Sequence, residues 1–119
     1  MIHQIQEGFS FKTFVNLSKY AGLTTSALAD ILELSPSTLI RRKIADKFKR
    51  NESDCLYRLS QILDASIELF NGDEESSKHW TNTPHVALGD HAPNQMIMTS
   101  AETDAVLDFI MRLEHGVFS

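Results

Sequence analysis

The sequence predicts an all-α protein, and three features of the chain support this fold class. β-branched residues are sparse, and no long stretch alternates apolar with polar residues as a half-buried strand does. Apolar residues instead recur at three- and four-residue spacing, which places them on one face of a helix. Residues that cap or stop helices divide these stretches into short segments. The 119 residues suffice for one domain or for two small helical modules that share a core.

Two short helices are predicted near the N-terminus. The first has an apolar face made of Phe11, Phe14, Leu17 and Ala21. Gly22 is a natural stop for it, because glycine readily adopts the left-handed backbone that ends a helix. Thr24 or Thr25 can cap the second helix. Its apolar residues are Leu28, Ala29, Ile31 and Leu32.

A third and a fourth helix follow. Ser35 and Pro36 open the third, because proline at the first helical position gives up an N–H that has no partner there. We expect this helix to be anchored inward by Leu39, Ile40 and Ile44. Asn51 with Asp54 predicts the cap of the fourth, and Asn71–Gly72 ends it. Its apolar residues are Leu56, Leu59, Ile62, Leu63, Ile67 and Phe70.

The rest of the chain predicts a second module. Acidic residues 73–75 favour a helix start and introduce a helix that reaches Trp80 and Asn82. Three helix breakers then leave two short helical pieces at residues 86–88 and 95–98; the breakers are Pro84, Gly89 and Pro93. Residues 99–102 fit a capping box that starts a last helix, which Gly116 should stop. Its inward residues are Val106, Phe109, Ile110 and Leu113. We place the module boundary at Asn71–Gly72, which gives modules 1–71 and 72–119.

Composition narrows the class of protein. Hydrophobic residues make up 42% of the chain and charged residues 23%, as in a folded soluble protein. No apolar run approaches the ~20 residues needed to cross a bilayer, and residues 1–4 lack the pattern of a signal peptide. We therefore expect a cytoplasmic protein with no membrane contact. Cys55 is the single cysteine, so no internal disulfide is expected and Cys55 should be a small buried residue.

Charge is unevenly distributed along the chain. The net charge is −5, yet residues 41–50 hold six of the eleven basic residues and a single acid. Residues 51–119 hold twelve acids and three bases. One basic patch suits an anionic polymer, and the acidic remainder limits non-specific binding to it.

The second and third predicted helices have the lengths of a helix-turn-helix. In that motif the early residues of the second helix meet base edges, and flanking basic residues hold phosphates. The base-edge candidates are Ser37, Thr38 and Arg41, and the phosphate candidates are Arg42, Lys43, Lys47 and Lys49. The alternative is an ordinary solvated helix of a bundle, because the tight turn near Glu33 has no glycine and the motif alone is common.

Other site chemistries find little support. His79, His85 and His91 are six residues apart, whereas zinc ligands on a helix favour spacings of three to four, so we expect no metal site. The sequence around Cys55 shows no base that would make it a catalytic nucleophile, and the chain has no glycine-rich phosphate-binding loop. We therefore expect that the chain is not an enzyme and that it binds no cofactor. Core gaps should be filled by three methionines, Met96, Met98 and Met111.

The second half of the chain carries a set of motifs in a fixed order: Trp80, Pro84, Ala87, Leu88, Gly89, Pro93, Glu114, His115, Gly116, Val117 and Phe118. These motifs resemble those of the Xre/MbcA/ParS antitoxin family. Members of this family show a Trp-x-x-x-Pro-x-x-Ala-Leu-Gly run, then a proline with a short apolar helix, and an ending of Glu, His or Tyr, Gly, x and Phe. Residues 35–43 and 52–59 are also similar, and the likeness runs from about Thr24 to Ser119. This chain departs from the family pattern after Leu88. The family usually has a Gly-Gly or Gly-x-x-Pro motif there, whereas residues 89–93 of this chain read Gly-Asp-His-Ala-Pro.

The resemblance implies an N-terminal Xre-like helix-turn-helix module and a C-terminal toxin-binding module. The N-terminal module would dimerise or bind the promoter of its own operon, so operator DNA and a homodimer are the expected partners. The toxin would be a RES-domain protein, which consumes NAD⁺, blocked at its active-site entrance by the C-terminus of the antitoxin. The toxin-binding residues expected on this basis are Trp80, Arg112, Glu114, His115, Gly116, Val117, Phe118 and Ser119.

The tail after Gly116 fits this role, with alternatives. Once the helix has stopped, Val117 and Phe118 have no helix face to hold them, and a projecting aromatic ring is a good anchor for a pocket. The carboxylate of Ser119 would then suit a basic NAD-phosphate site. Phe118 folding back onto its own core is one alternative, and Trp80 acting only as a core anchor is another. At the level of function, the alternative is a stand-alone helix-turn-helix transcription regulator with a C-terminal dimerisation or sensing domain.

Overall fold

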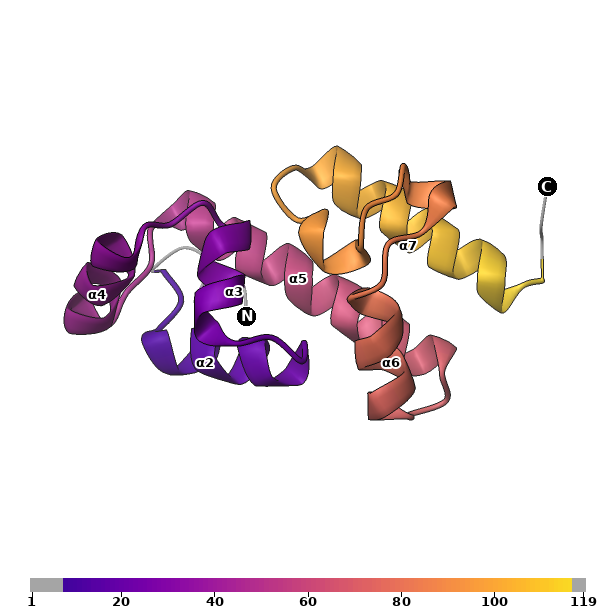
Figure 1. Ribbon diagram of the computed structural model, residues 1–119, viewed down its shortest axis with the longest axis horizontal. Coiled ribbons are helices and arrows are strands. Elements are labelled where there is room, and N and C mark those ends of the chain that lie inside the picture. Colours follow the sequence, from indigo (N-terminus) through magenta and orange to yellow (C-terminus); the bar gives the residue numbers. More distant parts are fainter. Residues whose placement is uncertain (1–7, 117–119) are drawn as a thin grey trace. The chain divides into compact units, whose positions relative to one another are not determined.

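The computed structural model describes residues 8–116, which form six α-helices and two 3-10 turns but no strand (Figure 1). This architecture confirms the predicted all-α class. Contacts divide the chain into two compact units, an N-terminal unit of Met1–Tyr57 and a C-terminal unit of Arg58–Ser119. The division lies within helix α5, whereas the predicted module boundary, Asn71–Gly72, lies just after that helix and stays a prediction.

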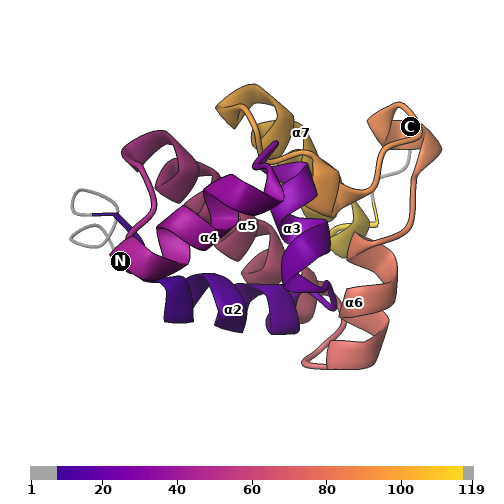
Figure 2. The same ribbon diagram turned by 60° about the vertical axis from the view of Figure 1, so that its left-hand side comes forward.

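The N-terminal unit contains α2 (Phe11–Tyr20), α3 (Thr25–Ile31), α4 (Pro36–Ala45) and the start of α5 (Arg50–Leu69). Three hydroxyl side chains cap the short helices by accepting a backbone N–H three residues ahead; they are Ser10, Thr24 and Ser35. The predicted caps at Thr24 and Ser35, with Pro36 opening α4, are thereby confirmed. In Figure 2 these short helices have come forward.

The core of the N-terminal unit is built on aromatic rings. Phe9, Phe14 and Phe48 are at most 1% exposed, and the rings of Phe14 and Phe48 stack with centroids 4.9 Å apart. Aliphatic side chains from α2, α3 and α5 complete it: Ala21, Leu28, Ala29, Leu32 and Leu56. Cys55 is also buried, as the sequence predicts. Burial of this apolar surface is the main force that holds α2, α3 and α5 together.

Helix α4 does not pack as the sequence suggests. None of its residues is buried, and Ile40 and Ile44 are 59% and 81% exposed. The prediction that both isoleucines anchor the helix is wrong. Helix α4 turns Leu39 inward, where it is half-buried, and leaves Ile40 and Ile44 on its exposed side.

Helix α5 begins earlier than predicted, at Arg50, so the cap expected at Asn51 with Asp54 is wrong. Glu52 takes that role, because its carboxylate accepts the backbone N–H of Lys49 at 2.8 Å. The predicted end of α5 is confirmed. Asn71 and Gly72 have φ angles of 54° and 89°, the left-handed backbone that stops a helix.

The C-terminal unit continues from α5 with α6 (Glu74–Thr81), η1 (Val86–Leu88), η2 (Pro93–Gln95) and α7 (Ser100–Glu114). Asp73 caps α6 and Thr99 caps α7, in line with the predicted helix starts. The short helix expected at residues 95–98 lies two residues earlier, because Pro93 begins it. Gly116, with φ of 65°, follows the end of α7 as expected.

The core of the C-terminal unit lies between the second part of α5 and α7. Its buried aliphatic side chains are Leu59, Ile62, Leu63, Leu88, Ile97, Val106 and Ile110. Arg58 fixes the segment before α7 by donating to the carbonyl oxygens of Ile97 at 2.7 Å and Met98 at 3.0 Å. Only part of the methionine prediction holds. Met96 is buried, but Met98 and Met111 are 36% and 52% exposed, so these two do not fill core gaps.

Candidate functional site

Most of the candidate DNA-contacting residues lie on the surface of α4 and the loop after it. Ser37, Arg41, Lys43, Lys47 and Lys49 are exposed. The ammonium group of Lys43 also lies 5.8 Å from the centroid of the Phe11 ring, a cation–π contact that limits where this charge can sit. The structure thus gathers five of the seven candidates on accessible surface of one unit, with the basic ones able to meet an anion.

Thr38 lies in a small polar network at the start of α4. Its hydroxyl oxygen accepts hydrogen bonds from the Ser35 hydroxyl at 2.9 Å and from Arg41 Nη2 at 3.0 Å. The Ser35 hydroxyl in turn caps the backbone N–H of Thr38. This network positions the Arg41 guanidinium beside the N-terminal end of the helix, so Thr38 supports Arg41 rather than standing free.

Arg42 is engaged inside the N-terminal unit. Its Nε and Nη2 atoms donate to the two carboxylate oxygens of Glu52 at 2.8 and 3.0 Å, a bidentate ion pair. Burial by itself would raise the pKa of Glu52, but the hydrogen bonds from Arg42 and Lys49, together with their charges, outweigh burial and lower it. The hydrogen bond to Glu52 raises the pKa of Arg42. Arg42, predicted from the sequence as a phosphate contact, is therefore engaged within its own unit, and its side chain is only 14% exposed.

The turn between α3 and α4 is tight without glycine. Glu33 adopts a left-handed backbone with φ of 60°, and the Leu34 N–H donates to the carbonyl of Ala29 at 2.9 Å. The absence of glycine at this turn therefore does not prevent a helix-turn-helix connection. A shallow cavity of about 270 Å³ lies between the two helices, lined by Thr25, Ser26, Ala29, Asp30, Leu34, Pro36, Leu39 and Ile40.

Trp80 is the centre of an aromatic cluster in the C-terminal unit. Its ring centroid lies 4.8 Å from His85, 5.9 Å from Phe109 and 6.3 Å from Phe70. The His85 ring nitrogen Nε2 also lies 3.0 Å from the carbonyl oxygen of Trp80, at hydrogen-bonding distance. These contacts join the turn after α5, α6, the loop and α7, so Trp80 has a packing role.

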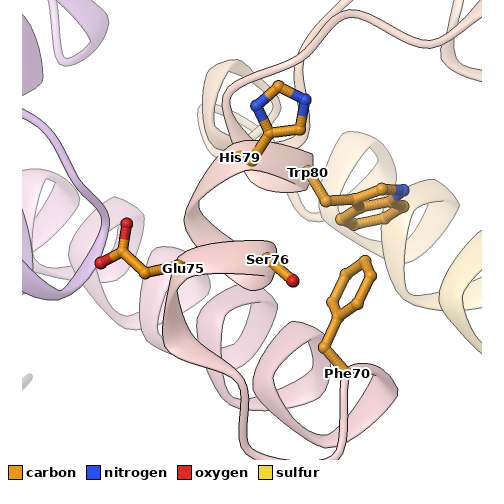
Figure 3. A pocket seen from close by; sticks show the side chains of 5 residues that line it. All are labelled: Phe70, Glu75, Ser76, His79 and Trp80. Atoms are coloured by element: carbon orange, nitrogen blue, oxygen red, sulfur yellow. The ribbon is translucent and has the colours of Figure 1, made fainter.

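Trp80 also borders a cavity of about 450 Å³, lined by Phe70, Glu75, Ser76, His79 and Trp80. Figure 3 shows the Phe70 and Trp80 rings close to each other with Ser76 directed toward them, while Glu75 points away on the far side of α6. Sequence reasoning missed Phe70 and His79 as site residues. The available signal was Phe70, an aromatic residue placed directly after α5 and just before the stop at Asn71–Gly72.

The remaining candidates for toxin contact lie at the end of α7. Arg112 is exposed and pairs with Asp108 one turn earlier at 3.0 Å. Glu114, His115 and Gly116 are exposed as well. Phe109, which packs on Trp80, lies one turn before Arg112 and connects this end of the helix to the aromatic cluster. Val117, Phe118 and Ser119 lie outside the described residues.

The described part of the chain offers neither a metal cluster nor a membrane-spanning helix. Within residues 8–116, no cluster of three or more His, Cys, Asp or Glu side chains is arranged to hold a metal ion. None of the helices in that range is long and apolar enough to span a bilayer. His85 and His91 do meet, but through their backbones, in an isolated antiparallel bridge with N···O of 3.2 Å.

Two family models match the chain, and together they cover most of it. Residues 1–60 match the model described as an antitoxin Xre-like helix-turn-helix domain. Residues 65–116 match the model described as the antitoxin Xre/MbcA/ParS C-terminal toxin-binding domain. The first range includes α4 with its basic residues, and the second includes the Trp80 cavity and α7.

Two similar proteins carry the name Antitoxin Xre. The one from Yersinia enterocolitica is 31% identical over 120 residues, which cover 100% of this chain and 81% of that protein. The one from Photorhabdus laumondii is 34% identical over 73 residues, covering 61% of this chain and 49% of that protein. The likeness to the first relative therefore extends through both units.

Proposed function

Because this chain belongs to the Xre antitoxin family, we propose that it inhibits a RES-type, NAD-consuming toxin and represses its own operon. The C-terminal unit binds the toxin and the N-terminal unit binds operator DNA. The chain acts by binding and not by catalysis, in the cytoplasm, where its operon lies. The observation that carries the proposal is the match of residues 65–116 to a toxin-binding domain.

The surface of the C-terminal unit supports toxin binding. Met111 is 52% exposed beside Arg112, Glu114 and His115, so the end of α7 offers an apolar side chain among polar ones. Interfaces between proteins typically combine an apolar centre with a polar rim. We infer that the segment Val117–Ser119 enters the active site of the toxin, while the end of α7 and the Trp80 cavity contact the surface around it.

The N-terminal unit supports operator binding. Helices α3 and α4 are joined by a tight turn, and α4 with the loop after it exposes Arg41, Lys43 and Lys47. The overall charge of −5 opposes binding to DNA. We propose a homodimer, in which two basic surfaces act together and offset the acidic remainder of each chain.

Removal of the last three residues tests the inhibition. The full chain and a version without Val117–Ser119 are each co-expressed with the proposed cognate RES-type toxin. We expect the truncated chain to fold, as judged by circular dichroism, and to fail to restore growth. The variant Lys12→Ala, at an exposed position of α2, is the control and should restore growth fully. Normal growth with the truncated chain would contradict the role given to the tail.

Arg112→Glu tests the contact at the end of α7. Arg112 is 57% exposed, and its ion pair with Asp108 is a surface pair of little value for stability. The variant should therefore fold normally and bind the toxin more weakly, which isothermal titration calorimetry measures. Asp108→Asn, which removes the other half of the same pair, is the matched control. Equal affinity of all three chains for the toxin would exclude this end of α7 from the interface.

A second candidate function is a stand-alone regulator that senses a ligand. The observation in its favour is the cavity of about 450 Å³ beside Phe70 and Trp80, which falls in the size range of small-molecule sites. Purification of the chain together with its neighbouring gene product decides between the two. A stable complex of the two proteins supports the antitoxin, and a chain that purifies alone supports the regulator.

A further inference from the structure

Helix α4 presents an apolar stripe to solvent. Ile40 and Ile44 are four residues apart and so share one face, and they are 59% and 81% exposed. Ser37, one turn before Ile40, is exposed on the same face. Most of the surface of these two isoleucines is left uncovered by their own unit, so it is available to a partner.

The opposite side of the helix fixes this orientation. Arg42 reaches inward to Glu52, and half-buried Leu39 lines the smaller cavity between α3 and α4, which Ile40 borders as well. Rotating α4 to bury the isoleucines would break the bidentate ion pair and leave the Glu52 carboxylate, 7% exposed, without its charged partner. The isoleucines are therefore held outward by the polar side of the same helix.

Charge around the stripe identifies the kind of partner. Arg41 lies one turn before Ile44 and Lys43 lies one turn after Ile40, so cations flank the stripe on both sides. Residues 41–50 hold six basic residues and one acid. A second copy of this helix docked face to face would bring these like charges together, because a two-fold contact joins the same patch on both subunits. An anionic polymer with apolar groups between its charges fits better.

Duplex DNA has this composition. Phosphates border the major groove, and within it the 5-methyl group of thymine is an apolar feature that side chains can read. We propose that Ile40 and Ile44 contact thymine methyl groups in the operator, while Arg41 and Lys43 lie toward its backbones. The proposal rests on the operator binding proposed above and names residues that set its sequence preference. Operators of this chain therefore contain thymine at the positions that face α4.

Removal of single methyl groups from DNA tests the proposal. Duplexes that bind the full chain are selected from a randomised 20-base-pair pool, and each thymine of the preferred duplex is replaced in turn by uracil, which lacks only the methyl. Fluorescence anisotropy measures the affinity. One or two replacements should weaken binding by about fourfold, the effect of one buried methyl-sized group. The same replacements should have no effect on the variant in which the contacting isoleucine is shortened, Ile40→Ala or Ile44→Ala.

Matched variants separate the possible outcomes. Val86→Ala, at an 88% exposed site in the C-terminal unit, should keep the full sensitivity to uracil. If uracil weakens binding equally for the chain and for both isoleucine variants, or never weakens it, the isoleucines do not read thymine. A loss of dimer mass in the isoleucine variants with uracil sensitivity unchanged would show a surface for self-association and also overturn the proposal. If no duplex is selected at all, the proposed operator binding is wrong, and the proposed thymine contact is wrong with it.

Discussion

Helices α4 and α7 are both exposed on one side, but they are held in place differently. Thr103, Val106 and Ile110 of α7 are buried in the core of the C-terminal unit, whereas α4 buries none of its residues. Helix α4 depends instead on the Ser35 cap at its start and on the ion pair between Arg42 and Glu52. A helix held by polar contacts keeps its apolar side chains for a partner, and a helix held by burial uses them for its own fold.

The largest effect is expected in the core under α7. Ile110 is 2% exposed, so Ile110→Ala removes buried methyl groups and leaves a cavity. We expect the free energy of unfolding to fall by about 3 kcal/mol, measured by urea denaturation followed by circular dichroism. A loss below about 1 kcal/mol would show that α7 is not held by burial.

The next effect concerns the polar contact that holds α4. Glu52→Gln keeps the size of the side chain but removes the charge that Arg42 and the Lys49 N–H meet. We expect a loss of about 2 kcal/mol in the same measurement, as for hydrogen bonds to a charged group. Glu68→Gln, at an exposed position of the same helix, is the control and should change stability by less than about 0.5 kcal/mol. Equal losses of stability for the two substitutions would mean that the ion pair between Arg42 and Glu52 does not hold α4 in place.

Acid should weaken the same contact. The pKa of Glu52 is lowered in the folded chain, so the stability it contributes is present above its unfolded pKa of about 4.3 and is lost as the pH falls through the folded value. The difference in unfolding free energy between the chain and Glu52→Gln should therefore shrink from pH 6 to pH 3. A difference that stays constant over this range would mean that Glu52 does not titrate below its ordinary value.

A smaller effect is expected at the start of α4. Ser35→Ala removes the hydroxyl that accepts the Thr38 N–H, which costs about 1 kcal/mol at a helix N-terminus. Ser37→Ala, at an exposed site two residues later, should have a much smaller effect. Urea denaturation checks both. If the two variants are equally stable, capping does not hold the beginning of α4.

The smallest effect is expected at Ile44. Ile44→Ala makes the same chemical change as Ile110→Ala, but at a site that is 81% exposed instead of 2%. We expect a change of less than about 0.5 kcal/mol in the free energy of unfolding, because little apolar surface is lost from the core. A loss near that of Ile110→Ala would mean that Ile44 packs as the sequence predicts and would remove the contrast between the two helices.

Local signals predicted much of the fold. The caps at Thr24, Ser35 and Thr99 and the stop at Asn71–Gly72 depend on neighbouring backbone groups, so they can be recognised from a few consecutive residues. The burial of Ile110 likewise follows from the spacing of apolar residues along α7. The sequence-based predictions were wrong where a contact formed only in the folded unit determines the local structure. Glu52 replaces the expected cap at Asn51, because it serves both the Lys49 N–H and Arg42.

The candidate sites divide in the same way. The basic stretch at residues 41–50 and the importance of Trp80 were evident in the order of residues, because charge and aromatic content need no fold to be recognised. The Trp80 cavity required Phe70 and His79 to be brought beside it, which happens only once α5 and α6 pack.

The sequence by itself determined the helical class, most helix starts and ends, and the position of the positive charge, because these depend on spacing and on local hydrogen bonds. Only the tertiary structure decided which side of α4 faces inward. Leu39 and Ile40 are equally apolar in the sequence, and the choice between them was made by Glu52, ten residues beyond Arg42, through an ion pair that forms only in the folded unit.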